Sequence, residues 1–329
     1  MTTAPDIQTL RAAVRMAGRA PSIHNSQPWR WLTATNSLHL YADASRLLPA
    51  TDPDGRDLLL SCGAALHHLQ VAAAAIGWKA KIHRLPHPNQ PDHLAAVEFV
   101  RHVPTTHDIA LAAAISRRHT DRRRFTSWPV PAELIADLAR AAGVHGMRLV
   151  AATDPDDCYQ LARAVAEAAV RQDADNAYAA ELSTWAGPSP FAVEGVPATN
   201  IPAGERRHAD TTTRAFPDAM LTESDSHGEP DAGELLVLAT AADGVEARLR
   251  AGEAMSAVLL WATEFRMATC PLSQVLEIKQ TRDLVRDRVL GGFGVPQIVL
   301  RVGWAPLNAG PLPATPRRPL DDILERQEQ

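Results

Sequence analysis

Residues 63–82 read GAALHHLQVAAAAIGWKAKI, and residues 252–272 read GEAMSAVLLWATEFRMATCPL. Each segment begins with Gly and is apolar on most of its faces, which is typical of a helix that is buried on all sides. The two segments therefore predict a pair of long central helices that pack against each other across a pseudo-twofold axis. Because any two Ala-rich helices can look alike, the flanking elements are needed to decide whether the chain is duplicated.

The elements around the two long helices follow one order. The first half contains a helix, two strands, the long helix and a strand, at residues 6–19, 29–34, 38–41, 58–76 and 96–102. The second half contains the same series, with Pro131 opening its first helix, at residues 131–142, 147–152, 235–240, 245–267 and 297–302. We therefore expect an α+β fold with mostly antiparallel central sheets flanked by helices. Two fused repeats, 1–108 and 109–329, would form a pseudo-dimer.

Composition excludes several classes of function. A net charge of -5 and a pI near 6.2 argue against a general nucleic-acid binder, which would show a basic excess. Cys62, Cys158 and Cys270 form no CxxC pair, so neither a disulfide framework nor a zinc site is predicted. Seven histidines without metal-ligand spacing are interpreted as surface residues: His67, His68, His83, His87, His93, His102 and His107.

The chain shows no pattern of a membrane or secreted protein. Polar residues interrupt its longest apolar stretch, Leu58 to Trp78, which predicts a buried helix rather than a membrane span. The opening residues MTTAPDIQ have neither a basic nor an apolar leader region, so we expect a cytoplasmic location.

The segment SRRHTDRRRF (116–125) holds five arginines, together with His119 and Thr120. Arginine binds phosphate through two parallel hydrogen bonds, and a hydroxyl can donate to a remaining oxygen. The segment therefore predicts a site for a phosphomonoester, on which Arg317 and Arg318 could converge. A solvated basic turn is the alternative interpretation.

The loop PSIHNSQPWRW (21–31) offers the side-chain amides and hydroxyls of Ser22, Asn25, Ser26 and Gln27 between two prolines. Such groups can recognise the edge of a flat heterocycle, although an ordinary turn before a strand would also explain them. This loop has no counterpart in the second half, and the arginine segment has none in the first. We therefore expect one composite site that takes one part from each half.

Residues 171–234 have no counterpart in the first half and are rich in Pro, Gly, Thr, Asp and Glu. An insertion of this length is usually either disordered or a functional lid. Its aromatic residues, Tyr178, Trp185, Phe191 and Phe216, favour a lid.

The pattern PSxxNSQPW after an amphipathic helix, with RHTxR before the equivalent helix in the other half, resembles the nitroreductase family of FMN proteins. A duplicated single chain is similar to the Acg-like branch of that family. The likeness covers most of the chain apart from 171–234. Family members act as homodimers with flavin at the subunit interface, so the resemblance implies a monomer that binds one FMN per chain.

The resemblance also implies roles for individual residues. Arg118, His119, Thr120 and Arg122 match the motif that holds the FMN phosphate and ribityl chain. Ser22, Ile23 and Asn25 match the loop that approaches the flavin from the partner subunit. Pro271, Leu272 and Ser273 match the backbone near the flavin N5, and Arg318 matches the C-terminal arginine that reaches the phosphate.

Three functions remain open. The first is an oxidoreductase that passes electrons from NAD(P)H through FMN to a nitroaromatic or quinone acceptor, with no catalytic side chain required because the flavin carries the chemistry. The second is a protein that stores or sequesters FMN beneath the 171–234 segment without turnover. The third is a scaffold that has lost its flavin.

Overall fold

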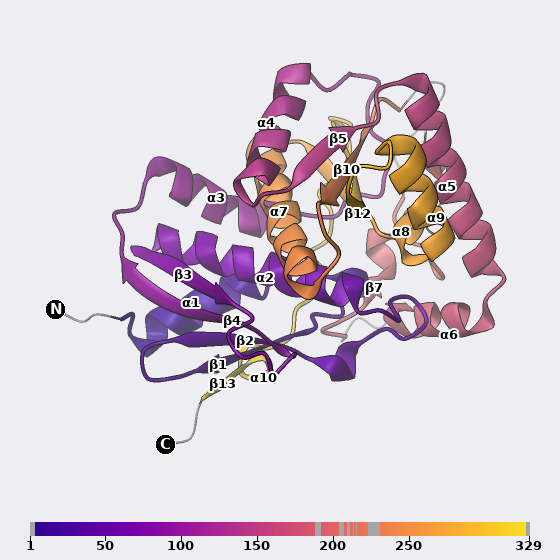
Figure 1. Cartoon of the computed structure of the whole chain (residues 1–329). Coiled ribbons are helices and arrows are strands. Elements are labelled where there is room, and N and C mark those ends of the chain that lie inside the picture. Colours follow the sequence, from indigo (N-terminus) through magenta and orange to yellow (C-terminus); the bar gives the residue numbers. More distant parts are fainter. Residues whose placement is uncertain are drawn as a thin grey trace.

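A computed structural model describes residues 4–187, 192–203, 207–208, 211–212, 214, 216–222 and 231–326. The two principal sheets lie on either side of two long helices, α2 (Arg56–Ala75) and α7 (Val245–Glu264), as Figure 1 shows. This arrangement of helices around two largely antiparallel sheets confirms the predicted α+β class.

The first sheet has the strand order β13-β1-β2-β4-β3. Its strands are β1 (Trp29–Thr33), β2 (Leu38–Ala42), β3 (Trp78–Arg84), β4 (His93–Arg101) and β13 (Leu324–Arg326). The predicted hairpin of β1 and β2 is confirmed, with buried residues alternating along β1 as one-sided burial requires. All pairs are antiparallel except β1 with β13, and β3 was not predicted.

The second sheet has the order β11-β12-β10-β5 and is antiparallel throughout. Its strands are β5 (Arg148–Ala151), β10 (Glu234–Thr240), β11 (Ala268–Leu272) and β12 (Val295–Gly303). The sequence predicted three of them and missed β11. Short two-stranded pairs are formed by β6 (Ala186–Gly187) with β7 (Val196–Pro197) and by β8 (Arg207–His208) with β9 (Thr211–Thr212).

The remaining helices cover the outer faces. Asp6 caps α1 (Ile7–Ala17) by accepting the Thr9 amide, and Pro131 precedes α4 (Ala132–Val144), as predicted. Helices that the patterns did not predict include α3 (Thr106–Arg117), α5 (Pro155–Asp173), α6 (Asn176–Trp185), α8 (Gln274–Glu277), α9 (Lys279–Leu284) and α10 (Leu320–Ile323). Single turns are η1 (Ile23–Asn25), η2 (Ala44–Arg46), η3 (Ala198–Asn200) and the π-helical η4 (Val285–Val289).

Helices α2 and α7 pack directly against each other, as predicted, and they cross at two glycines. A Cβ on Gly63 would lie 2.9 Å from the Gly252 Cα, and a Cβ on Gly252 would lie 2.9 Å from the Gly63 Cα. Either Cβ would also overlap a carbonyl oxygen of the opposite helix, that of Leu249 or of Leu60. The helix backbones are thus in contact, which only glycine permits here.

Helix α2 is long and apolar enough to cross a membrane by length and composition alone. However, 83% of its apolar window is buried inside the protein. This confirms the prediction of a buried helix for this stretch.

The C-terminal strand β13 pairs with β1, so the first sheet takes its edge strand from the far end of the chain. The division into repeats at residue 108 stays a prediction, as does the origin of the two halves by duplication. Part of the predicted 171–234 insertion lies outside the described residues.

We expect Gly252→Ala to destabilise the protein by about 1–3 kcal/mol, because the added methyl group must push two buried helices apart. Chemical denaturation would measure the change. Gly143→Ala in α4 is the matched control, since nothing lies within 4 Å of its Cβ position. Alanine is the better helix former, so the control should be neutral or stabilising. Equal effects at both positions would contradict the close crossing.

Candidate functional site

A cavity of about 100 Å³ lies where the two halves of the fold meet. Seven of the predicted site residues line it: Ser22, Ile23, Thr120, Arg122, Pro271, Leu272 and Ser273. Helix α2 adds Asp57, Leu60 and Ser61, helix α7 adds Met255, and β12 adds Ile298. The loop of the first half and the arginine segment of the second half therefore share one cavity.

The loop after α1 has an unusual backbone. His24, Asn25 and Gln27 have positive φ angles of 46°, 56° and 50°, which are uncommon for residues other than glycine. The Ser22 hydroxyl accepts a hydrogen bond from the backbone N–H of Gln27 at 3.0 Å. The Ser61 hydroxyl on α2 accepts one from the backbone N–H of Ile23 at 3.1 Å. These bonds hold Ser22 and Ile23 against the cavity.

Asn25 belongs to the loop motif that the family resemblance places near the flavin, but its side chain forms hydrogen bonds away from the cavity. Its side-chain amide donates to the carbonyl oxygens of Gly195 and Pro316, each at 3.1 Å, and its Oδ1 accepts from Arg317 at 3.0 Å. Asn25 does not line the cavity, and it joins the loop to the insertion and to the C-terminal segment. Its contacts support a positioning role, whereas direct contact with a flavin stays a prediction.

Beside this cavity, Arg19, Arg118 and Arg317 form a cluster of positive charge. Arg118 is only 7% exposed, and its Nε and Nη1 have no hydrogen-bond partner in the part of the chain that the structure describes, nor do the Nε atoms of Arg19 and Arg317. Within the described residues, no acidic side chain forms an ion pair with any of the three. Burial and the neighbouring arginines lower the pKa of Arg118 to about 10 and that of Arg317 to about 9.

Unpaired buried guanidinium groups are costly unless an anion compensates them. Two members of the cluster are close in sequence to residues that line the cavity. Arg19 lies two residues before Pro21, and Arg118 lies two residues before Thr120. We interpret the cluster as a candidate anion site next to the cavity. Arg19 was missed by the sequence interpretation, because a single arginine at the end of a helix carries no motif.

The two C-terminal arginines, Arg317 and Arg318, contact different parts of the structure. Arg317 donates to the carbonyl oxygens of Arg19 and Ala20, at 3.1 and 3.3 Å, and joins the cluster. Arg318 instead donates to the carbonyl oxygens of Asp322 and Gln27 and lies 3.8 Å from the Asp43 carboxylate. These contacts support Arg317 and give no support to Arg318 as the phosphate-binding residue.

The other members of the arginine segment also differ from one another. Arg122 lines the cavity, with its guanidinium 5.1 Å from the centre of the Phe216 ring. Arg123 is buried in an ion pair with Asp121 at 2.8 Å, and Arg117 is exposed. His119 is half-buried, and burial together with Arg118 lowers its pKa.

The interpretation of His67, His68 and His93 as surface residues was wrong, because all three are buried. His67 and His68 each place Nδ1 2.8 Å from the Ser256 hydroxyl, which bridges α2 and α7. The Nε2 of His68 has no hydrogen-bond partner among the described residues, and burial, Arg118 and His67 lower the pKa of His68. No group of three or more His, Cys, Asp or Glu side chains in the described part of the chain is placed to hold a metal ion.

Pro271 and Leu272, the last two residues of β11, line the cavity together with Ser273, which follows the strand, and Cys270 lies beside them. Burial raises the pKa of the Cys270 thiol, which is 2% exposed. This supports a structural cysteine over a redox thiol. The Ser273 hydroxyl donates to Glu277 at 2.8 Å and accepts from Arg214 at 3.2 Å.

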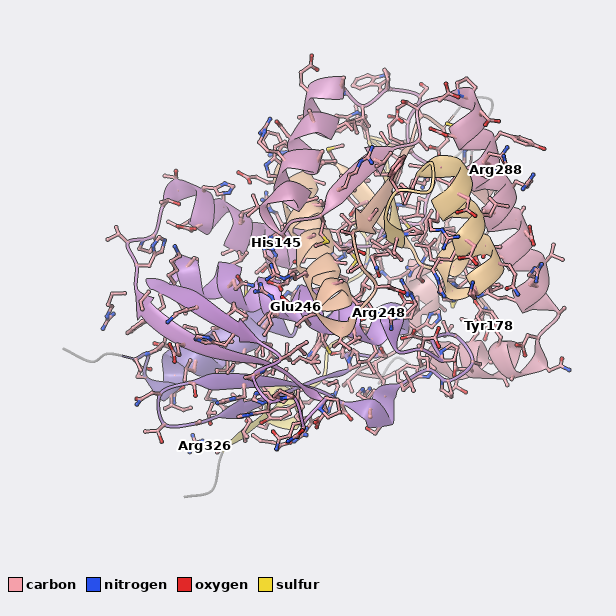
Figure 2. All side chains as sticks on the ribbon, viewed as in Figure 1. His145, Tyr178, Glu246, Arg248, Arg288 and Arg326 are labelled. Carbon is pink, nitrogen blue, oxygen red and sulfur yellow. The ribbon has the colours of Figure 1, made fainter. Side chains whose placement is uncertain are left out.

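Arg214 and Phe216 from the insertion also line the cavity. Arg214 forms an ion pair with Glu277 and lies 3.0 Å from the His24 Nε2 and 2.6 Å from the hydroxyl of Tyr178, which α6 provides (Figure 2). Phe216 meets the His24 ring edge-on at 5.7 Å. The insertion therefore builds one wall of the cavity, whereas its action as a lid stays a prediction.

Comparison with known proteins places the chain in a family. The family model described as "Nitroreductase family" matches residues 115–304, more than half of the chain. The chain belongs to the nitroreductase family. A "Putative NAD(P)H nitroreductase" of Mycobacterium tuberculosis is 47% identical over 99% of this chain and 93% of that protein. The "Putative NAD(P)H nitroreductase acg" of the same organism is 38% identical over 96% of this chain and 95% of its own length.

Among solved structures, the nitroreductase NfnB from sphigopyxis sp. strain HMH is 18% identical, with a TM-score of 0.40. It covers 67% of this chain and 99% of its own. A nitroreductase from Desulfitobacterium hafniense is 14% identical with the same TM-score, over 67% of this chain and 98% of its own. These values are too low to add to the family membership that the sequence relatives establish.

We expect millimolar phosphate to raise the melting temperature of the ligand-free protein, because an anion that binds only the folded state stabilises it. Arg118→Ala should abolish most of this shift, whereas Arg117→Ala, at the exposed neighbouring position, should retain it. Scanning fluorimetry with chloride at equal ionic strength controls for screening. A shift of equal size in chloride would contradict a specific anion site.

Proposed function

We propose that the chain is an FMN-dependent oxidoreductase that passes electrons from NAD(P)H to a small acceptor such as a nitroaromatic or a quinone. The observation that carries the proposal is the cluster of Arg19, Arg118 and Arg317, in which Arg118 is buried. Among the residues that the structure describes, no acidic side chain pairs with this cluster, which adjoins the cavity. Membership of the nitroreductase family and relatives named as NAD(P)H nitroreductases support it.

The residues present suit FMN at two places. Guanidinium groups with unpaired donors are the natural partners of a terminal phosphate. Apolar side chains from both halves, Leu60, Met255 and Ile298, line the cavity and suit an aromatic ring system. Ser22, Thr120 and Ser273 add hydroxyl groups at its edge.

Bound FMN would supply the electron transfer itself. The protein's part is to bind and orient: the arginine cluster holds the phosphate, and the loop at Ser22 and Ile23 closes one side of the ring site. The backbone at Pro271–Ser273 approaches from the other repeat. Buried apolar walls exclude water, which strengthens polar contacts inside the cavity.

One chain contributes both parts of the cavity, which supports a monomer that binds one FMN as an intramolecular pseudo-dimer. The proposed division into repeats at 1–108 and 109–329 agrees with the separate origins of the loop and the arginine segment. We also propose a cytoplasmic location, where nicotinamide cofactors are available.

Storage of FMN without turnover is the second candidate. Arg214 and Phe216 favour it, because side chains of the insertion already occupy one wall of the cavity. If the insertion excludes nicotinamide, a bound flavin would stay oxidised. The Phe216→Ala variant would then gain NADPH-dependent reduction that the wild type lacks.

We expect Arg118→Ala to weaken FMN binding by about 1.5–3 kcal/mol, through loss of a charge-assisted hydrogen bond. Quenching of flavin fluorescence on titration would measure the affinity. Arg117→Ala, outside the cluster, should bind FMN as the wild type does. Unchanged affinity in Arg118→Ala would contradict the assigned phosphate site.

We expect anaerobic NADPH or NADH to bleach the visible absorbance of FMN bound to the wild-type protein. Addition of menadione should restore it, because the quinone accepts the electrons. A flavin that stays oxidised with both nucleotides in excess would contradict the oxidoreductase and leave storage as the better account. A colourless protein that takes up no added FMN would support the scaffold.

A further inference from the structure

A second, smaller cavity of about 10 Å³ adjoins the main one, and its volume is close to the least that holds one water molecule. Its lining includes Asp54, which is exposed, so the small cavity lies near the surface. Asp57, in the first turn of α2, lines both cavities and is the residue that their linings share. It therefore connects the main cavity with a space near solvent.

The carboxyl group of Asp57 has no partner in the described part of the chain, with neither a hydrogen bond nor an ion pair, although the residue is only 9% exposed. Its acidic neighbours are satisfied. Asp52 accepts the Leu58 amide at 2.8 Å, and Glu277 pairs with Arg214. Arg56 is turned towards Asp243 and Gln297 instead.

The charges around Asp57 disfavour its ionised form. Burial, then Asp52 on the preceding loop and Glu277 on α8, raises the pKa of Asp57 well above its ordinary range. Arg214 and Arg56 oppose this shift but are already paired. Burial likewise raises the pKa of Asp52 to about 6.

Four other titratable groups among the described residues line the main cavity: His24, Arg122, Arg214 and Cys270. Burial, Arg214 and Arg122 lower the pKa of His24 well below its ordinary value, so its ring is neutral. Arg122 remains protonated, since arginine loses its proton only far above pH 7. Arg214 stays protonated in its ion pair with Glu277, and burial raises the pKa of the Cys270 thiol, so neither group gives up a proton readily near neutral pH. Asp57 is the carboxyl group at the main cavity, and it is the residue that also reaches the small cavity.

The proposed reaction needs such a proton. Reduction of a quinone by two electrons takes up two protons, and reduction of a nitro group to a nitroso group with loss of water does the same. NAD(P)H supplies both electrons and one proton equivalent as it becomes NAD(P)+. One further proton must therefore reach the buried site from solvent in each turnover.

We propose that Asp57 delivers this proton: its neutral carboxyl gives the proton up at the main cavity and becomes a carboxylate. It then regains a proton from solvent through the small cavity beside Asp52. This step rests on the proposed oxidoreductase function. It supplies a proton donor that the sequence interpretation did not identify, because Asp57 follows an unremarkable Gly-Arg pair.

The first test measures the protonation state without turnover. In ligand-free protein labelled with carbon-13 at aspartate side-chain carboxyls, Asp57→Asn identifies the signal that belongs to Asp57. We expect that signal to report a protonated carboxyl at pH 7, whereas the ordinary pKa of aspartate is about 4. An ionised Asp57 at pH 7 would overturn the proposal.

The second test uses NADPH and menadione with the FMN-loaded protein. Asp57→Asn should slow menadione reduction by about 10²–10⁴-fold, the usual contribution of a positioned acid, with FMN affinity unchanged. Asp57→Glu should recover part of the rate with an altered pH profile. Asp156→Asn is the matched control, since Asp156 holds the same second position in α5 but is exposed.

The outcomes separate this inference from the function on which it rests. Wild-type rates and pH profile in Asp57→Asn would overturn proton delivery by Asp57 and leave the oxidoreductase intact. A wild-type protein that oxidises no NADPH with menadione present would overturn both.

Discussion

Gly63 and Gly252 let the backbones of α2 and α7 touch, and the position of the cavity depends on this crossing. From the crossing, α2 directs Asp57, Leu60 and Ser61 to the cavity, while α7 directs Met255. A side chain on either glycine would separate the helices and widen the space between the two sheets. The site is therefore a consequence of how closely two buried helices can approach.

Polar groups buried at the same helix pair make the packing specific. Ser256 on α7 lies 2.8 Å from both His67 and His68, and Glu253, which is fully buried, pairs with Arg84 at 2.7 Å. His145, between α4 and α7, lies 4.0 Å from the same carboxylate (Figure 2). Because a buried polar atom without a partner is costly, these contacts penalise any sliding of one helix along the other.

The sequence predicted the elements with strong periodicity and those with clear end signals. The two long helices, the hairpin at Trp29 and the helix after Pro131 belong to this group, as do the loop and arginine motifs that now share a cavity. Contacts between segments that are distant in the sequence could not be predicted from these patterns. Arg19, His68 and Asp57 gain their significance only from neighbours far along the chain, and β13 pairs with a strand almost 300 residues before it. Arg317 and Arg318 are adjacent in the sequence, and only the folded backbone distinguishes them.

Two groups of opposite charge lie near the cavity. In the described part of the chain, Arg19, Arg118 and Arg317 next to the cavity have no acidic partner, whereas Asp52, Asp57 and Glu277 lie close together and Glu277 pairs with Arg214. Each group alone would destabilise the ligand-free fold, since unpaired buried charge is costly. A phosphorylated ligand relieves the first cost, and a proton on Asp57 relieves the second. The same residues that weaken the empty protein therefore prepare it for a ligand that carries negative charge and for a reaction that consumes a proton.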